Sequence, residues 1–567
     1  MKDGCMLLSN FNLLATAPGG VARLRELILT LAVQGKLVQQ DPGDEPASVL
    51  LKKIQVEKDR LIAEGKIKRD KPLAEIADEE KPFELPIGWE WERFGVIAGI
   101  ERGGSPRPIQ SFLTNDPDGL NWIKIGDTEK GGKYITSSSE KIRREGLSKT
   151  RMVFPGDFLL TNSMSFGRPY ITQIEGCIHD GWLRISPPSS LNKDFLYVLL
   201  SSRFIRTVFE AAAAGGVVLN LNADKVRTVP IPLPPLAEQS RIVTRVEELM
   251  HVCDALEAKG KLEVSQHAQL VSTLLGTLTG SGTPEMLTQN WQRIAVHFDL
   301  LLDRPQAIDA FEQTILQLAV RGLIVPQNPS DEPASVLLKK VRAEKDGLIA
   351  EGKIKRDKPL MEITDEEKPF EVPKGWEWST LAAIGIINPR NNADDDVTAS
   401  FVQMSSIPVG FLASHITEPR PWRDIKSGFT QFSEGDVGVA KITPCFENGK
   451  STVFQNLSNG IGAGTTELHI VRPLCRIVPK YVLLFLKTPS FLIEGEAMMT
   501  GSAGQKRMPR NYFENKPFPL PPLDEQARIV TRVEELHQLC ADLRQRLFAS
   551  QTTQAHLAEA LVESVAE

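Results

Sequence analysis

Carboxylates, hydroxyls and histidines that could act in catalysis are present in this chain, but they form no recognisable catalytic pattern. The sequence has no Asp/Asn/Ser-Pro-Pro-Tyr/Phe methyltransferase motif, no phosphate-binding P-loop and no His-Glu-x-x-His zinc motif. Asp127 with Glu129, and the run Asp394–Asp396, have no base beside them, so turn formation is a better interpretation than catalysis. Ser163 lacks the Gly-x-Ser-x-Gly context of a nucleophile. We therefore expect no catalytic residue.

The residue types that most often bind metals are also scattered along the sequence. The eight His are widely separated, and the six Cys include no Cys-x-x-Cys pair. Cys177 and His179 lie two residues apart, but no second pair follows nearby, so ordinary packing is the better interpretation. We expect no metal site and no cofactor bound by this chain.

Polar loops rich in Gly, Asn, Ser and Arg offer another chemistry, the recognition of DNA. Arg pairs with guanine edges, Asn and Gln pair with adenine edges, and cations contact phosphates. The sharpest example is Thr161–Arg168, which follows an apolar run and contains Gly167 for close backbone approach. A solvated surface loop is the alternative interpretation of every such segment. The candidates in the first half of the chain are Arg102, Ser105, Arg107, Asn162, Ser163, Ser165, Arg168, Asn220 and Asn222.

The second half of the chain has comparable loops. Lys506 and Arg507 are adjacent cations on a Gly-rich segment, so we hypothesise that both contact DNA. The candidates in this half are Lys441, Thr443, Asn448, Lys450, Thr465, Gln505, Lys506, Arg507 and Arg510.

Most of the remaining sequence occurs twice, at one constant interval. The segment DEPASVLLKK begins at Asp44 and again at Asp331, and a segment ending in GWEW ends at Trp91 and again at Trp378. PLPPLxEQxRIVTRVEEL begins at Pro232 and again at Pro519. Between these blocks the two halves differ almost everywhere. This indicates a tandem duplication carrying two unlike inserts.

The repeated blocks are predicted to be helical. Apolar residues after each EQxRIV motif recur with alternating steps of four and three, which is typical of a helix packed along one face. The apolar positions are Ile242, Val246, Leu249, Cys253 and Leu256, then Ile529, Val533, Leu536, Cys540, Leu543 and Leu547. We expect this face to continue through Leu270, Leu274 and Leu278, and through Leu557, Leu561 and Val565. Gly65 and Gly352 are predicted to end an earlier pair of helices.

The inserts are predicted to be mixed α/β domains, because each has short β-like runs broken by Gly and Pro and followed by a helical segment. The first insert is mildly basic, with 18 Lys and Arg against 14 Asp and Glu, which permits DNA binding without requiring it. The expected organisation is an N-terminal helical region 1–91, a domain 92–229, a central helical region 230–378 with a long helix at about 236–279, a domain 379–516 and a C-terminal helix 517–567.

The order of these motifs resembles the specificity subunit of a type I restriction–modification system. LPxGWEW precedes each insert, and PLPPLxEQxRIV follows each insert before a long helix. RGGSPRP from Arg102 is similar to the Gly-Gly-Thr-Pro turn at the start of the family's target-recognition domains, with Ser105 in place of Thr. INPRNN from Ile387 lacks that turn. FPGDFLLT and SEGDVGVAKI are similar to the family's Gly-Asp strand.

The resemblance implies an α+β multidomain fold, with two target-recognition domains separated by long antiparallel, coiled-coil-like helices. It implies an asymmetric bipartite site on double-stranded DNA. It also implies two methyltransferase subunits and, through them, restriction subunits as partners. S-adenosylmethionine, ATP and Mg would belong to those partners, and the complex would methylate adenine N6 and cleave DNA with ATP. The chain itself would be no enzyme.

Composition agrees with a large, multidomain protein. The chain has 567 residues, 41% of them hydrophobic, and no apolar run or leader typical of membrane or secreted proteins. Free thiols favour a reducing compartment, so we expect a cytoplasmic location and no membrane partner. Two alternatives remain, a self-contained DNA methyltransferase or nuclease with degenerate motifs and a coiled-coil adaptor that binds protein.

Overall fold

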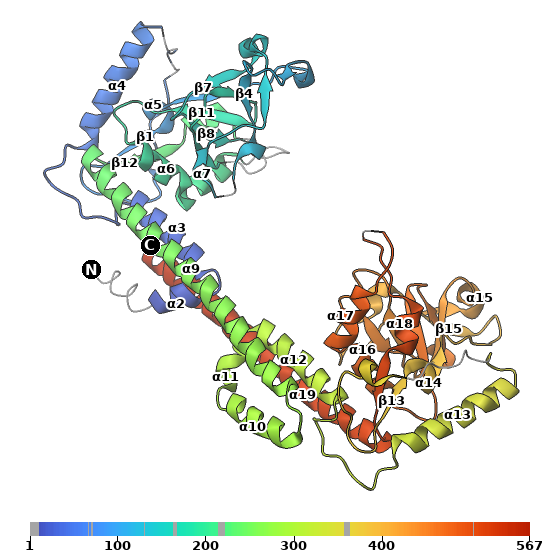
Figure 1. Ribbon diagram of the computed structural model, residues 1–567. Coiled ribbons are helices and arrows are strands. Elements are labelled where there is room, and N and C mark those ends of the chain that lie inside the picture. Colours follow the sequence, from blue (N-terminus) through green and yellow to red (C-terminus); the bar gives the residue numbers. More distant parts are fainter. Residues whose placement is uncertain are drawn as a thin grey trace. The chain divides into compact units, whose positions relative to one another are not determined.

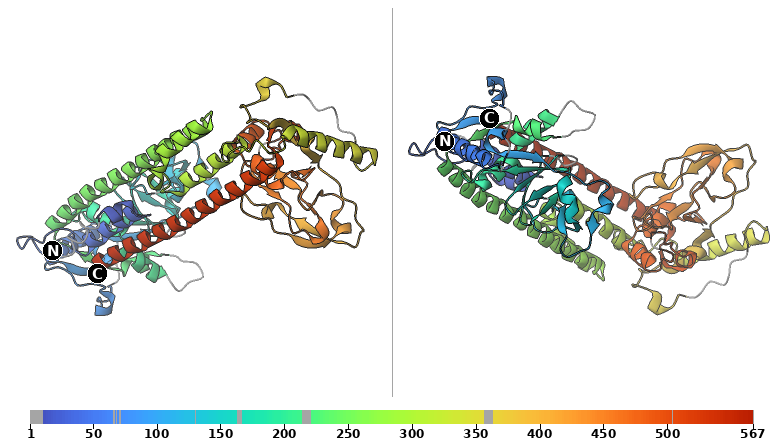
Figure 2. Two further views of the ribbon diagram at one scale, coloured as in Figure 1. Left: turned by 90° about the horizontal axis from the view of Figure 1, so that it is seen from below. Right: turned by 90° about the horizontal axis from the view of Figure 1, so that it is seen from above.

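The computed structural model describes residues 11–65, 67, 69, 72–129, 131–162, 167–213, 221–355, 363–502 and 504–566. Its contacts divide the chain into two compact units (Figure 1). The first unit comprises Met1–Leu262 and Gln551–Glu567, and the second comprises Glu263–Ser550. The boundary falls within two long helices, α9 (Leu236–Thr279) and α19 (Leu523–Ala566), so each unit holds part of both. In both views of Figure 2, α19 (red) is one unbroken helix.

The insert of the first unit forms two five-stranded sheets, with strand orders β3-β6-β4-β10-β7 and β2-β11-β8-β9-β5. The first sheet consists of β3 (Leu113–Thr114), β4 (Leu120–Ile123), β6 (Glu140–Ile142), β7 (Arg151–Val153) and β10 (Gly176–Ile178). The second consists of β2 (Gly99–Arg102), β5 (Tyr134–Ile135), β8 (Phe158–Thr161), β9 (Pro169–Thr172) and β11 (Trp182–Ser186). The short helix α5 (Phe94–Ile97) precedes these strands, and α6 (Lys193–Ser201), α7 (Arg203–Ala213) and α8 (Ala223–Arg227) follow them.

Strand β8 shows why the strand sequences of this insert are apolar throughout. Phe158 and Leu160 are buried in one core cluster with the residues of α6 and α7, whereas Leu159 is buried in another cluster with residues of β4 and β10. The strand is thus covered on both faces, and a strand covered on both faces reads as a continuous apolar run rather than an alternating one. In Figure 1, α6 and α7 lie below β8 and β11.

The insert of the second unit has the same strand order, with one edge strand fewer in each sheet. Its sheets are β14-β21-β18-β19 and β16-β15-β20-β17. The strands are β14 (Gly385–Ile387), β15 (Thr398–Val402), β16 (Glu418–Pro421), β17 (Thr430–Ser433), β18 (Val437–Ala440), β19 (Ser451–Val453), β20 (Ile461–Gly464) and β21 (Leu468–Pro473). The helices are α14 (Leu381–Ile384), α15 (Trp422–Ile425), α16 (Pro479–Leu486), α17 (Pro489–Ala497) and α18 (Arg510–Asn515). The mixed α+β prediction is confirmed.

The repeated blocks form matching helices in the two units. They are α2 (Phe11–Thr16), α3 (Gly20–Val33) and α4 (Ala47–Ala63) in the first, and α11 (Phe298–Leu301), α12 (Pro305–Val320) and α13 (Ala334–Ala350) in the second. A further helix of the second unit is α10 (Pro284–Ala295). Gly65 and Gly352, each with φ of 69°, follow α4 and α13, which confirms the predicted helix ends.

A two-stranded ribbon closes the base of each insert. In the first unit β1 (Glu90–Arg93) pairs antiparallel with β12 (Pro230–Leu233), so that Trp91 lies opposite Pro232. In the second unit β13 (Glu377–Thr380) pairs with β22 (Pro517–Leu520), and Trp378 lies opposite Pro519. The start and end of each insert are therefore held together by main-chain hydrogen bonds, whatever sequence lies between them.

The EQxRIV motif holds each ribbon on its long helix. The indole Nε1 of Trp89 donates to Oε2 of Glu238 over 2.9 Å, and the Gln40 amide donates to Oε1 over 3.1 Å. Glu238 is only 1% exposed, and burial raises its pKa despite these two donors. Arg241 binds Asp44 through two hydrogen bonds of 3.2 and 2.6 Å. The duplicated motif is therefore a structural junction.

The second unit repeats this junction with residues of the second copy. Trp376 donates to Glu525 over 3.0 Å, Gln327 donates to it over 3.2 Å, and Arg528 binds Asp331. Glu525 is also 1% exposed.

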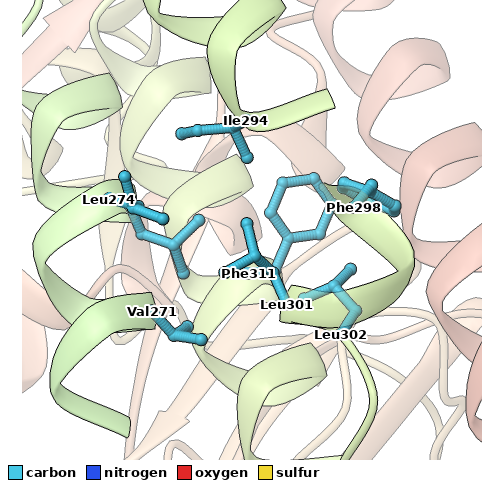
Figure 3. A pocket seen from close by; sticks show the side chains of 8 residues that line it. Val271, Leu274, Ile294, Phe298, Leu301, Leu302 and Phe311 are labelled. Carbon is cyan, nitrogen blue, oxygen red and sulfur yellow. The ribbon is translucent and has the colours of Figure 1, made fainter. Parts of the chain in front are cut away.

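One predicted apolar position near the end of each long helix is displaced by one residue, whereas Leu278 and Val565 are buried as predicted. Ile242, Val246 and Cys253 are buried as expected, but Leu270 is 51% exposed and Val271 is buried instead. Figure 3 shows why: Val271 and Leu274 face a small apolar cavity lined by Ile294 of α10 and by side chains of α11 and α12. In α19 Leu557 is 54% exposed while Ala558 is buried. The predictions for Leu270 and Leu557 are therefore wrong.

The helices among the described residues include none long and apolar enough to cross a bilayer. No group of three or more His, Cys, Asp or Glu side chains among them is arranged to hold a metal. The Cys177, Cys253 and Cys540 thiols are free and buried.

The Trp89–Glu238 hydrogen bond should contribute measurably to stability. Trp89→Phe removes a donor from a buried carboxylate, which costs about 1–3 kcal/mol. Hydrogen exchange should report lower protection in the first turns of α9, whereas Glu247→Gln, at an exposed position of the same helix, should leave it unchanged. In a double-mutant cycle with Glu238→Gln, the two costs should not add. Unchanged protection in Trp89→Phe would contradict the junction.

Acid should destabilise the second unit through His469. This ring is 5% exposed and stacks on Phe513, and burial lowers its pKa to about 4. The unfolded chain takes up a proton near pH 6.5 and the folded chain does not, so the stabilisation present above that pH is lost as pH falls toward 4. We expect the free energy of unfolding to be about 2 kcal/mol lower at pH 5 than at pH 7 from this group.

Urea unfolding of the second unit at both pH values measures this effect. His469→Gln should reduce the pH dependence, and His297→Gln, at an exposed position, should not. Equal pH dependence in His469→Gln and the unaltered protein would rule out His469 as the source.

Candidate nucleic-acid interface

In the first unit four of the predicted DNA-contacting residues contact Asp180, in the three-residue connection between β10 and β11. The Ser105 hydroxyl donates to Oδ1 of Asp180 over 2.8 Å, and Arg107 lies 3.4 Å from Oδ2. Nε of Arg102 donates to the Asp180 main-chain oxygen over 3.2 Å. The hydrogen bond from Ser105 is the main cause of a lowered Asp180 pKa. At neutral pH this site is a carboxylate surrounded by donors.

The glycine pair of RGGSPRP is explained by close packing, of Gly103 against that connection and of Gly104 against Lys149. Gly103 and Gly104 donate main-chain hydrogen bonds to Trp182 and Ile178. A Cβ on Gly103 would lie 2.2 Å from the His179 main-chain oxygen, and one on Gly104 would lie 2.6 Å from that of Lys149. Both distances are far below van der Waals contact, so only glycine fits.

Asn162 links the end of β8 to Asp180 and to Leu221. Its amide donates to the Asp180 main-chain oxygen over 2.7 Å, and its own main-chain oxygen accepts from Leu221 over 3.1 Å. The Asn162 side chain is 1% exposed, so its amide supports the site from within the fold. Asn222 immediately precedes α8 and caps it by accepting a hydrogen bond from the Lys225 main-chain N–H.

The other candidates of this half are placed as follows. Arg168 is exposed, and its main chain pairs with Thr161 at the end of β8. Ser163, Ser165 and Asn220 lie outside the described residues.

Cys177 and His179 lie in the core of the same region. Cys177 is fully buried, and burial raises the pKa of its thiol to about 11. The His179 ring packs between Trp122 and Trp182, and burial lowers its pKa. This confirms the packing interpretation.

In the second unit the corresponding connection, between β20 and β21, carries Glu467. The Arg507 guanidinium donates three hydrogen bonds of 2.8 to 3.2 Å to its carboxylate, and this contact lowers the Glu467 pKa. Lys441 donates from its main chain to the Glu467 oxygen over 2.9 Å, as Asn162 does to Gly181 in the first unit. Lys506 and Arg507 are both exposed, and Arg507 is paired with an acid.

A second hydrogen-bonded segment brings the two candidate loops of this unit together. Thr443 donates to the Lys506 main-chain oxygen from both its N–H and its hydroxyl, and Met508 donates to Lys441. Lys487, buried in the fold, donates to Gly449 and Val409, and burial lowers its pKa to about 7.

The remaining candidates of the second half vary in exposure. Lys450 donates to Met404 over 2.8 Å, and Arg510 pairs with Glu514 one helical turn later. Thr465 accepts from Glu467 within the connection, and Asn448 and Gln505 are exposed.

Sequence reasoning missed the two acids at the centre of these clusters. Asp180 and Glu467 are single acidic residues in unlike loops, and neither spacing nor composition distinguishes them from other surface carboxylates. Their shared place becomes visible once the strand order is known, because each lies in the three-residue connection that leads into the second strand of its sheet.

Comparison with known proteins gives one consistent result. The model of the type I restriction modification DNA specificity domain matches residues 86–266. The chain is 36% identical over 573 residues to the type I restriction enzyme EcoAI specificity subunit of Escherichia coli, covering 96% of this chain and 94% of that protein. It is 35% identical over 579 residues to the EcoEI specificity subunit of Escherichia coli, with the same coverage.

Among solved structures, the HsdS subunit from Thermoanaerobacter tengcongensis aligns with a TM-score of 0.39 and 18% identity, over 86% of this chain and 98% of that chain. The family assignment follows from the sequence identity over nearly the whole length of the two Escherichia coli relatives. The chain belongs to the family of type I restriction enzyme specificity subunits.

Proposed function

We propose that this chain is the DNA-reading subunit of a type I restriction–modification complex, with each insert reading one half of an asymmetric bipartite site. One observation carries the proposal. The two inserts share one strand order but have unlike loops, and each insert is attached to the same repeated junction. Unlike loops on a common fold present different base-reading side chains, so the two half-sites should differ in sequence.

The clusters around Asp180 and Glu467 are the proposed reading surfaces. Exposed cations there, such as Arg107 and Lys506, would contact DNA directly, because their side chains reach solvent. Asn162 and Asn222 would act by holding the loops in place, since their amides are engaged within the fold. Asp180 would orient Ser105 and Arg107 and would repel a misplaced phosphate.

The long helices are proposed to separate the two reading domains as an antiparallel pair. Each has 44 residues and is therefore roughly 66 Å long. Domains that read one face of a duplex must lie about 34 Å apart or a multiple of that distance, which helices of this length can span. The domain boundaries are proposed to follow the inserts at 92–229 and 379–516.

The duplicated scaffold is proposed to bind two methyltransferase subunits, because two copies of one surface accept two copies of one partner. Restriction subunits would join through them. S-adenosylmethionine, ATP and Mg would be bound by those partners, and this chain would contribute recognition without catalysis, in the cytoplasm.

Domain exchange tests the proposal. The chain is expressed with the methyltransferase of its system, and methylated adenines are mapped across the genome. Replacing residues 92–229 with the equivalent insert of another family member should change one half of the methylated motif and retain the other half. The β1–β12 ribbon keeps the ends of the insert together, so the exchanged chain should fold. A motif that changes in both halves, or in neither, would contradict the assignment of one half-site to each insert.

A further inference from the structure

A turn that the sequence motifs did not single out packs directly on the Arg102–Pro106 segment of the first unit. It comprises Arg143–Lys149, between β6 and β7. Gly146 of this turn abuts Pro106, and a Cβ there would lie 3.5 Å from that ring. Arg143 donates from its main chain to Phe112 over 2.8 Å. At the end of the turn, Arg151 donates to the Arg102 main-chain oxygen over 3.1 Å.

The cations of this turn are exposed and mostly unneutralised. Arg143, Arg144 and Lys149 are all exposed, and Nζ of Lys149 lies 5.4 Å from the centre of the Phe112 ring. Within the described part of the chain, no carboxylate forms an ion pair with Arg143 or Arg144. The turn contains one acid, the exposed Glu145.

The second unit provides an internal comparison, because its strand order is the same. The equivalent connection, between β16 and β17, carries Arg423 and Lys426. Arg423 lies 2.5 Å from Asp396, and Lys426 lies 2.5 Å from Asp395. The run Asp394–Asp396 that sequence reasoning assigned to turn formation thus neutralises the cations of this connection. The cations of this connection are therefore paired with carboxylates in the second unit, whereas Arg143 and Arg144 are not paired with any carboxylate of the described residues in the first unit.

We propose that the Arg143–Lys149 turn is a phosphate-binding surface of the first unit, which anchors the duplex beside the Asp180 cluster. The proposal rests on the proposed function and adds a contact that the second unit lacks. The backbone of the turn is held by its packing, and the two free guanidinium groups that it carries suit phosphate oxygens, which accept paired N–H donors. Such contacts set affinity and position without reading bases.

The salt dependence of DNA binding tests the proposal. The full chain, in complex with its methyltransferase subunits, is titrated into a fluorescein-labelled duplex of scrambled sequence at about 50 to 200 mM NaCl. The association constant K falls as salt rises, and each lost phosphate contact makes the slope of log K against log[salt] shallower by about 0.9. The double variant Arg143→Ala/Arg144→Ala should therefore reduce the magnitude of the slope by about 2.

Two matched variants make the result specific. Arg423→Ala/Lys426→Ala removes the same charge from the equivalent connection and should leave the slope nearly unchanged, because those cations are already paired. Arg143→Lys/Arg144→Lys keeps the charge and should restore most of the slope. Thermal unfolding of each variant should match the unaltered complex, since the replaced side chains are exposed.

The outcomes separate this proposal from the function on which it rests. A slope unchanged in Arg143→Ala/Arg144→Ala, or lowered equally in Arg423→Ala/Lys426→Ala, would overturn the phosphate site while leaving DNA recognition intact. Failure of the unaltered complex to bind any duplex would overturn the proposed function itself.

Discussion

A buried carboxylate at the start of each long helix is the constraint on which the rest of the fold depends. A carboxylate removed from water is costly unless donors satisfy it. Glu238 and Glu525 each receive an indole N–H from the repeated GWEW segment and a side-chain amide from Gln40 or Gln327, which lie shortly before the repeated DEPASVLLKK segments. The motifs are therefore parts of one junction, and substitution of any one would leave a buried polar group without its partner.

This junction allows the inserts to vary. The Trp that binds the carboxylate immediately precedes the strand that opens each ribbon, and the closing strand leads directly into the long helix. Both ends of an insert are thus fixed at adjacent points of the scaffold. A domain attached in this way can change its loops without disturbing the helices, which accounts for a chain in which the scaffold is nearly identical and the inserts are unlike.

The inserts retain one fold and differ in how charge is distributed over it. Each has an acidic residue in the connection before β11 or β21, and in each that acid binds a neighbouring cation. The connection after β6 has free guanidinium groups in the first insert, whereas its counterpart after β16 is neutralised by aspartates. The two inserts therefore present different charged elements to solvent.

The sequence predicted the repeated scaffold well because its signals are local. Helical spacing placed Ile242, Val246 and Cys253 in the core, and Gly65 and Gly352 ended their helices. The same spacing failed at Leu270, because packing against α10 and its neighbours buries Val271 instead. It failed also at Leu557, where Ala558 is buried in a cluster of the first unit, and a periodic pattern cannot anticipate such displacements. The predicted loops did meet around Asn162 and Lys441. The acids that organise them, and the pairing of Arg507, depend on strand order and could not be inferred from one sequence.

Hydroxyl-radical footprinting of the assembled complex on a duplex carrying its methylated motif tests the central claim most directly. The claim is that two separate domains contact two separate stretches of DNA. The predicted result is two protected stretches with an accessible spacer between them, and loss of protection in one stretch alone when the loops of one insert are altered. A single continuous protected stretch, or loss of both stretches from altering one insert, would contradict the account.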